Sequence, residues 1–243
     1  MKPRAKIVYL FHSGYAVETQ NNLFIFDYWQ SGLPQAAGKL NEGIITADYL
    51  KTKANVYVFA SHSHPDHYDP VIWEWSKYNS NLTYVLSSDI PVKGEPSRCQ
   101  RMSPYEEWAD GEVKVKTFSS TDEGVSFLVW ADELTIFHAG DLNWWHWKGE
   151  SQAERERAEM LFKTEVDKIA VHSLDIAFFP VDHRLEEFYS IGAEYFAAKL
   201  RPQILLPMHF GDEFGTSKAF AEKVGNSLST VGITHRGQEF IYE

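Results

Sequence analysis

An apolar run leads directly into a cluster of metal-binding side chains in the sequence Val56-Tyr57-Val58-Phe59-Ala60-Ser61-His62-Ser63-His64-Pro65-Asp66-His67. The apolar part predicts a buried strand, and the polar part then lies on the loop that follows it. His62 and His64 are two residues apart and point to the same side of an extended segment. Asp66 and His67 follow the turn at Pro65 and can face a second position. Imidazole together with carboxylate suits zinc, manganese or iron rather than calcium or magnesium. The alternative is a solvated His-rich loop, but such tracts are typically longer and simpler in composition.

Length and composition are typical of a folded α/β protein. The chain has 243 residues, of which 44% are hydrophobic and 15% aromatic, so it can bury a substantial core. We expect a single domain that spans residues 1–243. Cys99 is the one cysteine, which excludes a disulfide framework and a thiolate zinc cluster. The formal charge of −11 argues against a nucleic-acid-binding surface, because phosphate binding draws on clustered Lys and Arg.

The N-terminal segment does not resemble a secretion signal. Its apolar run ends at His12, too early for the apolar region of a signal peptide. No apolar segment of the sequence approaches the length of a membrane span. We therefore expect a cytoplasmic protein without a membrane partner.

Short apolar or alternating runs separated by turn residues dominate the first half, and strands alternate with helices in the second half. The predicted strands are residues 6–11, 23–28, 56–60, 82–86, 113–118, 125–130, 134–138, 175–181, 204–208 and 239–242. The predicted helices are residues 70–77, 150–173, 185–200 and 216–228. This order predicts two sheets that face each other with helices outside, a four-layer αββα sandwich of the α/β class.

Two further strands end in side chains that can bind a metal. The sequence Ile136-Phe137-His138-Ala139-Gly140-Asp141 runs into a tight glycine turn and presents Asp141 at the strand end. The sequence Leu205-Leu206-Pro207-Met208-His209 is apolar and ends in an imidazole. We expect these strand ends to carry the chemistry together with the first motif, since functional residues are often held on loops at one end of a scaffold.

The order of these motifs resembles the metallo-β-lactamase fold superfamily. The motifs are His62-x-His64-x-Asp66-His67, then His138-Ala139-Gly140-Asp141, then Pro207-Met208-His209. Within the superfamily, the chain is most similar to the metal-dependent hydrolases related to ascorbate-6-phosphate lactonase. The segments Phe26-Asp27 and Asp175-Ile176-Ala177-Phe178-Phe179-Pro180 also look like that branch. The resemblance covers about residues 6–210.

The resemblance implies an αββα sandwich that holds one or two divalent transition metals, zinc preferred, with manganese or iron as alternatives. Carried over residue by residue, His62 and His64 bind the first metal, and Asp66, His67 and His209 bind the second, with Asp141 as the bridge. Asp66 and Asp141 are then also catalytic, because a water activated by the metals attacks an electrophilic carbonyl or phosphorus.

One departure concerns the first metal. The superfamily pattern usually supplies another histidine between the first motif and the Gly-Asp turn, but this sequence has no histidine between His67 and His138. The first metal then keeps only His62, His64 and the shared Asp141, unless Asp122, His138 or His146 replaces the missing histidine. We therefore expect an asymmetric site in which one metal is held more tightly.

Several other residues are candidates for supporting roles. We predict that His12 contacts the substrate or supports the ligands, with a structural role as the alternative. Asp27 is expected to hydrogen-bond the metal-ligand loop, and Asp122 to shape the pocket or orient water. His138 is more typical of a buried, hydrogen-bonded histidine than of a ligand.

The segment after the strand at 175–181 offers a proton donor, His183, and a cation for an anionic substrate, Arg184. The alternative for both is a surface loop. The aromatic residues 144–147 either line the substrate pocket or pack in the core. Residues 32–43 and 141–150 are expected to border the pocket.

The sequence therefore favours a metal-dependent hydrolase acting on a small-molecule ester, lactone or phosphoester, with no nucleic-acid partner and with homo-oligomer formation left open. A non-catalytic metal-binding or regulatory protein with an incomplete first metal site is the alternative. A flavodiiron-type oxidoreductase is less consistent with the sequence, because that family has Glu in place of His64 and an added flavin-binding domain.

Overall fold

The computed structural model describes residues 4–30, 38–94 and 96–243. The chain comprises two compact units, Met1–Ser103 with His235–Glu243, and Pro104–Thr234, here called unit 1 and unit 2. Each unit contains one sheet and its own helices. The mixed α/β class predicted from the sequence is confirmed. The single domain stays a prediction.

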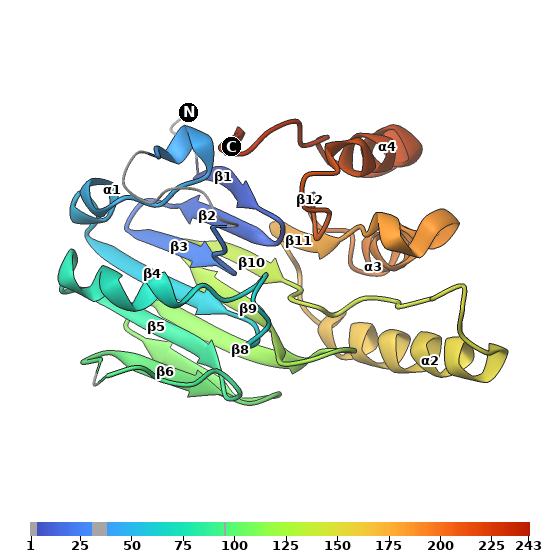
Figure 1. Cartoon of the computed structure of the whole chain (residues 1–243), viewed down its shortest axis with the longest axis horizontal. Coiled ribbons are helices and arrows are strands. Elements are labelled where there is room, and N and C mark those ends of the chain that lie inside the picture. The colour runs from blue at the N-terminus through green and yellow to red at the C-terminus, as the bar shows by residue number, and fades with distance from the viewer. Residues whose placement is uncertain (1–3, 31–37, 95) are drawn as a thin grey trace. The chain divides into compact units, whose positions relative to one another are not determined.

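Unit 1 contains a seven-stranded sheet in the order β13-β1-β2-β3-β4-β5-β6 (Figure 1). Strands β1 to β3 and β13 pair antiparallel, and β3 to β6 pair parallel. The strands are β1 Ala5–Phe11, β2 Gly14–Glu18, β3 Asn22–Phe26, β4 Asn55–Ala60, β5 Leu82–Ser87, β6 Cys99–Met102 and β13 Glu239–Tyr242. The helical segments are η1 Leu40–Glu42, α1 Ala47–Lys51 and η2 Pro70–Lys77.

Unit 2 contains a six-stranded sheet in the order β12-β11-β10-β9-β8-β7. Strands β7 to β10 pair antiparallel, and β10 to β12 pair parallel. The strands are β7 Glu107–Asp110, β8 Val113–Ser119, β9 Val125–Ala131, β10 Leu134–His138, β11 Ile176–Pro180 and β12 Ile204–Met208. The helical segments are α2 Gln152–Ile169, η3 His183–Phe188, α3 Ile191–Leu200, α4 Phe214–Val224 and η4 Gly225–Ser227.

The alternation of side chains along β4 explains how helices attach to the sheet of unit 1. Val56, Val58 and Ala60 point to one face and join a buried cluster with Ile72 and Trp75 of η2. The intervening Tyr57 and Phe59 are also buried, on the opposite face. A strand that is buried on both faces reads as a continuous apolar run, as this one does.

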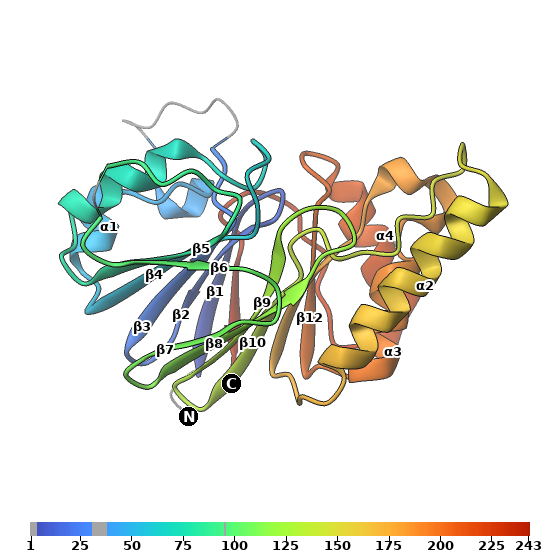
Figure 2. The same cartoon turned by 90° about the horizontal axis from the view of Figure 1, so that it is seen from below.

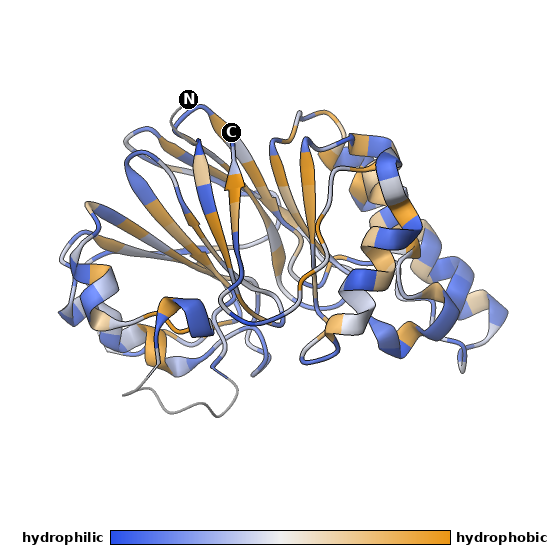
Figure 3. Cartoon of the chain, turned by 90° about the horizontal axis from the view of Figure 1, so that it is seen from above, coloured by the Kyte–Doolittle hydropathy of each residue, from blue (hydrophilic) through white to orange (hydrophobic). Residues whose placement is uncertain are grey.

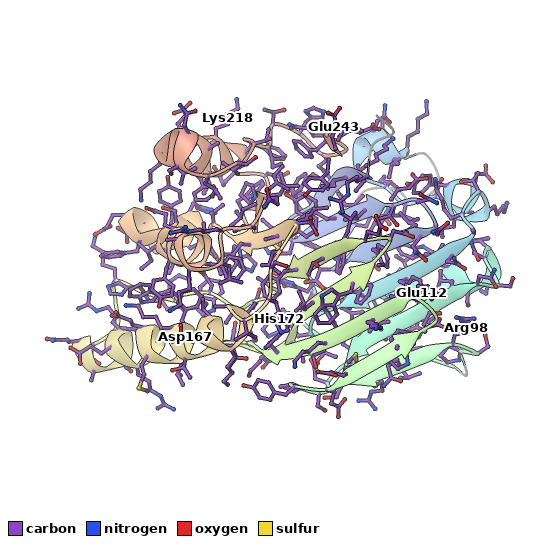
Figure 4. The ribbon with its side chains drawn as sticks, turned by 180° about the vertical axis from the view of Figure 1, so that it is seen from behind. Arg98, Glu112, Asp167, His172, Lys218 and Glu243 are labelled. Carbon is purple, nitrogen blue, oxygen red and sulfur yellow. The ribbon has the colours of Figure 1, made fainter. Side chains whose placement is uncertain are left out.

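The helices of unit 2 lie on one side of its sheet (Figure 2). The strands are mainly hydrophobic, whereas the helices carry many hydrophilic residues (Figure 3). Figure 4 locates Asp167 on α2 and Lys218 on α4, and both are exposed. The buried Glu165 of α2 accepts a hydrogen bond from Ser119 N at 2.8 Å, which ties the end of β8 to this helix.

The strands with continuous apolar runs agree with the sequence prediction within about two residues, and three differences have local causes. β2, β6, β7 and α1 are not predicted, because they are short and three of them are partly exposed. The predicted helix 185–200 is two segments, η3 and α3, because Ser190 between them has the non-helical angles φ −122° and ψ −1°. The predicted helix 216–228 ends earlier, at Gly225, which has φ 51°.

Among the described residues, no helix combines the length and apolar character needed to cross a membrane.

Phe179 of β11 tests the packing of helices on the sheet of unit 2. Its buried ring stacks on that of Phe196 of α3, with centroids 4.5 Å apart. We expect Phe179→Ala to lower the free energy of unfolding by about 3–5 kcal/mol, because truncation leaves a cavity. Met160→Ala, on the exposed side of α2, should change it by less than about 0.5 kcal/mol. Urea unfolding measures both, and equal effects would contradict this description of the core.

Candidate metal-binding residues

In unit 1, the candidate residues follow the C-terminal ends of two neighbouring parallel strands. Asp27 comes directly after β3, and the segment from Ser61 to His67 comes directly after β4. Parallel pairing brings these ends to the same edge of the sheet, where ligands commonly bind in α/β proteins. The strand order thus brings together a carboxylate and a histidine cluster that lie 34 or more residues apart.

Asp27 is a buried carboxylate that organises the loop after β4. Its Oδ1 accepts a hydrogen bond from Ser61 N, and its Oδ2 accepts one from Ser61 Oγ, both at 2.7 Å. The same Oδ2 lies 2.7 Å from His67 Nδ1. A carboxylate bonded to Nδ1 fixes the orientation of the ring and leaves Nε2 as the nitrogen available to a metal.

His62 and His64 form a close pair. Ser61 Oγ lies 2.9 Å from His62 Nδ1, and His62 Nε2 lies 2.9 Å from His64 Nδ1. The ring centroids are 4.5 Å apart. The two ring nitrogens are at hydrogen-bonding distance, so each imidazole holds the other in place, and both can offer a nitrogen to one cation. Asp89, after β5, supports this loop by accepting a hydrogen bond from Ser63 N at 2.7 Å.

Asp66, His67 and His12 form a second group in unit 1. Each of the three offers one ligand atom, and these atoms lie within 4.8 Å of one another. His12 Nε2 and Asp66 Oδ2 are 3.4 Å apart. Burial alone would raise the pKa of the Asp66 carboxyl, but His12 and His67 outweigh it and hold that pKa well below its ordinary value. Asp66 is therefore ionised at neutral pH, the form that binds metal.

In unit 2, Asp141 and His209 are adjacent. Gly140, with φ 53°, turns the chain after β10, and Asp141 then faces His209 at the end of β12. Asp141 Oδ1 and His209 Nε2 are 3.2 Å apart, and both side chains are at most 5% exposed. Trp145 packs against the His209 ring, with centroids 5.5 Å apart.

Asp182 orients His209 in the same way that Asp27 orients His67. Its Oδ2 lies 3.0 Å from His209 Nδ1, and Arg184 Nε lies 2.9 Å from both carboxylate oxygens. Burial raises the pKa of the Asp182 carboxyl, but the bonds from His209 and Arg184 outweigh it and keep that pKa well below its ordinary value. Sequence reasoning did not select Asp182. The signal was its position, two residues after the end of β11 and beside the strand that carries His209.

Three of the candidate residues have positive φ angles, a conformation that non-glycine residues rarely adopt. The angles are 52° for His12, 41° for Asp27 and 69° for His209. Such residues cost about 1–3 kcal/mol each and gather at functional sites. At these three positions, which follow strand ends and carry ligand-type side chains, the unusual backbone supports a functional site.

The segment that lacks the expected histidine has a different role in unit 2. Thr121 Oγ1 donates a hydrogen bond to Asn143 O at 2.6 Å and accepts one from Asn143 N at 2.9 Å. Thr121 thereby fixes the loop that follows Asp141. Asp122 is exposed and is not in any group of ligand atoms found among the described residues. Its predicted contribution to the pocket stays a prediction.

The other predicted residues lie apart from these groups. His138 is buried, and its Nδ1 accepts a hydrogen bond from Gly140 N at 3.2 Å. His146 contacts the Phe188 ring at 4.3 Å between centroids. His183 is exposed at the start of η3, and its role as a proton donor stays a prediction. Of the two segments expected to border the pocket, 32–43 lies partly outside the described residues, which resume at 38.

The donor set fits a divalent transition metal. Both units offer imidazole and carboxylate, and in each unit one imidazole has its Nδ1 bonded to a buried Asp. Carboxylate–histidine couples of this kind typically accompany metal-binding histidines. The absence of thiolate ligands and the presence of imidazole suit zinc, manganese or iron.

Comparisons with known proteins agree with this description. No family model matches the chain. A UPF0173 metal-dependent hydrolase of Bacillus thuringiensis subsp. konkukian is 24% identical over 225 residues, which are 84% of this chain and 85% of that protein.

Solved structures resemble the whole chain. Igni18, a metallo hydrolase of the archaeon Ignicoccus hospitalis, has a TM-score of 0.67 at 16% identity and 98% coverage of both chains. CmlA, a diiron β-hydroxylase of Streptomyces venezuelae, has a TM-score of 0.65 at 13% identity, covering 100% of this chain and 55% of that one. YhfI of Bacillus subtilis, a metallo-β-lactamase fold protein, has a TM-score of 0.60 at 12% identity, covering 99% and 100%.

These likenesses show that the chain has the metallo-β-lactamase fold, as the resemblance predicts. The closer similarity to ascorbate-6-phosphate lactonase stays a prediction.

Asp27→Asn tests the orienting role of the buried carboxylate. The amide has one acceptor oxygen where the carboxylate uses two, so it cannot keep the bonds from Ser61 N, Ser61 Oγ and His67 Nδ1 together. We therefore expect the affinity for zinc to fall by about 10–100-fold. Asp69→Asn is the matched control, because Asp69 caps η2, where Asn is an equivalent residue. Competition with a chromogenic chelator measures both affinities. Equal affinities in the two variants would contradict this role.

Proposed function

We propose that this protein is a metal-dependent hydrolase that acts on a small-molecule ester, lactone or phosphoester. The observation that carries the proposal is the pair of carboxylate–histidine couples, Asp27–His67 in unit 1 and Asp182–His209 in unit 2. The likeness to a metal-dependent hydrolase of Bacillus thuringiensis and to a metallo hydrolase of Ignicoccus hospitalis supports it.

We further propose that the six residues predicted as ligands from the sequence, four in unit 1 and two in unit 2, bind metal. His62, His64, Asp66 and His67 would be the ligands from unit 1, and Asp141 and His209 the ligands from unit 2. The support is that every one of these side chains follows a strand end and that Asp141 Oδ1 and His209 Nε2 are 3.2 Å apart, a spacing typical of two ligands of one cation. The cofactor would be one or two divalent transition metals, with zinc preferred.

When bound, such a metal supplies Lewis acidity and a water nucleophile at neutral pH. The residues of the chain have complementary tasks. Asp66 and Asp141 provide the negative charge that offsets the cation, and Asp27 and Asp182 keep the imidazoles in the orientation that presents Nε2. Arg184, which is exposed beside Asp182, would attract an anionic group of the substrate.

The substrate assay described below also tests one alternative function. A non-catalytic metal-binding or regulatory protein is favoured by the exposed Asp122 in the segment where a third imidazole is expected for His62 and His64.

Asp66→Ala tests hydrolysis directly. The purified protein, supplied with zinc or manganese, would be assayed against p-nitrophenyl acetate, a simple lactone and bis-p-nitrophenyl phosphate. We expect turnover of at least one substrate. In the variant, kcat/KM should fall by at least about a hundredfold, because losing a metal ligand lowers activity more than losing a residue that only hydrogen-bonds a ligand.

Asp48→Ala is the matched control, since the Asp48 side chain is 92% exposed and far from the motif in sequence. It should retain full activity. Metal binding without turnover of any substrate would instead support the non-catalytic alternative.

A further inference from the structure

His12 occupies a constrained position beside two of the proposed ligands of unit 1. It lies in the turn between β1 and β2, with a positive φ, and is 8% exposed. Its ring meets that of His67 edge to face, with centroids 5.5 Å apart, and that of Trp29 at 5.8 Å. The turn and the surrounding rings therefore hold the imidazole against Asp66 and His67.

The spacing of His12 from Asp66 is that of two ligands of one cation rather than of a hydrogen-bonded pair. Charge-assisted hydrogen bonds are about 2.7–2.9 Å long, and the Asp27–His67 couple has this length, 2.7 Å. Two donor atoms of a tetrahedral zinc ion are about 3.3 Å apart. His12 Nε2 and Asp66 Oδ2 are 3.4 Å apart, close to the separation of the proposed ligand atoms of Asp141 and His209, 3.2 Å.

We propose that His12 is itself a metal ligand, so that unit 1 alone supplies three donors, His12, Asp66 and His67, for a divalent transition metal. The ligand atoms of these three residues lie within 4.8 Å of one another. This inference rests on the metal centre of the proposed function and extends its ligand set. Two imidazoles and one carboxylate suit Zn²⁺, Mn²⁺ or Fe²⁺.

The ligand set predicts which of the two metal positions in unit 1 binds its metal more tightly. The group that contains His12 has three donors within unit 1, whereas His62 and His64 are two donors. The position at His12, Asp66 and His67 is then the tighter of the two, and it retains a metal even when His209 is removed.

The test is nuclear magnetic resonance of the whole chain, labelled with ¹⁵N in its histidines and loaded with ¹¹³Cd²⁺. Direct ligation gives a scalar coupling between cadmium and the coordinating ring nitrogen. We expect this coupling at Nε2 of both His12 and His67. In His12→Ala, one imidazole coupling should disappear while the coupling at His67 remains, and cadmium affinity should fall by at least about tenfold.

His172→Ala is the matched control, because His172 of unit 2 packs against Phe118 and Trp130 and belongs to neither ligand group. It should keep every coupling. His209→Ala should also keep the coupling at His12. If His12→Ala does not fold, the assigned spectrum of the unaltered chain still shows whether His12 Nε2 is coupled to cadmium.

Cadmium bound through His67 without coupling at His12 would overturn this inference alone and leave the proposed function standing. No cadmium binding at all would overturn both.

Discussion

The buried carboxylate of Asp27 connects the fold of unit 1 to its chemistry. A carboxylate removed from water is costly unless its oxygens accept hydrogen bonds, and Asp27 accepts them from Ser61 and His67. The backbone after β3 is therefore tied to the loop after β4, and the ring of His67 is held in one orientation. The histidine motif is thus a preorganised surface rather than a flexible loop, which lowers the cost of binding a cation.

Unit 2 repeats this arrangement with different residues. Asp182 follows β11, His209 follows the neighbouring parallel strand β12, and the carboxylate orients the ring. In both units most of the ligand-type residues follow strands of the parallel part of the sheet, because parallel strands end at the same edge. His12, in the antiparallel turn between β1 and β2, is the exception. The antiparallel strands extend each sheet and bury its apolar side chains. The same local arrangement, a buried carboxylate that orients an imidazole, therefore occurs in each sheet.

Much of this could be predicted from the sequence, and the rest depends on pairing between distant segments. Strands such as β4 and β12 are continuous apolar runs, so their positions are visible locally. β6 and β7 are partly exposed and polar, and therefore resemble loops. The motif residues and Asp141 could be recognised because they directly follow predicted strands. The contact between Asp182 and His209 could not be predicted from the sequence, because it arises from the parallel register of β11 and β12. The position of His12 could not be predicted either. It depends on the turn between β1 and β2, and β2 was not recognised in the sequence.

If these histidines and carboxylates hold a transition metal, the purified protein contains it. The most direct measurement is elemental analysis of the whole chain, purified without added metal or chelator, by inductively coupled plasma mass spectrometry. We expect at least about one zinc, manganese or iron ion per chain, and a large loss of that metal when Asp66 and His67 are both replaced by alanine. A chain that folds normally but contains no transition metal, or a variant that keeps its full content, would contradict the account.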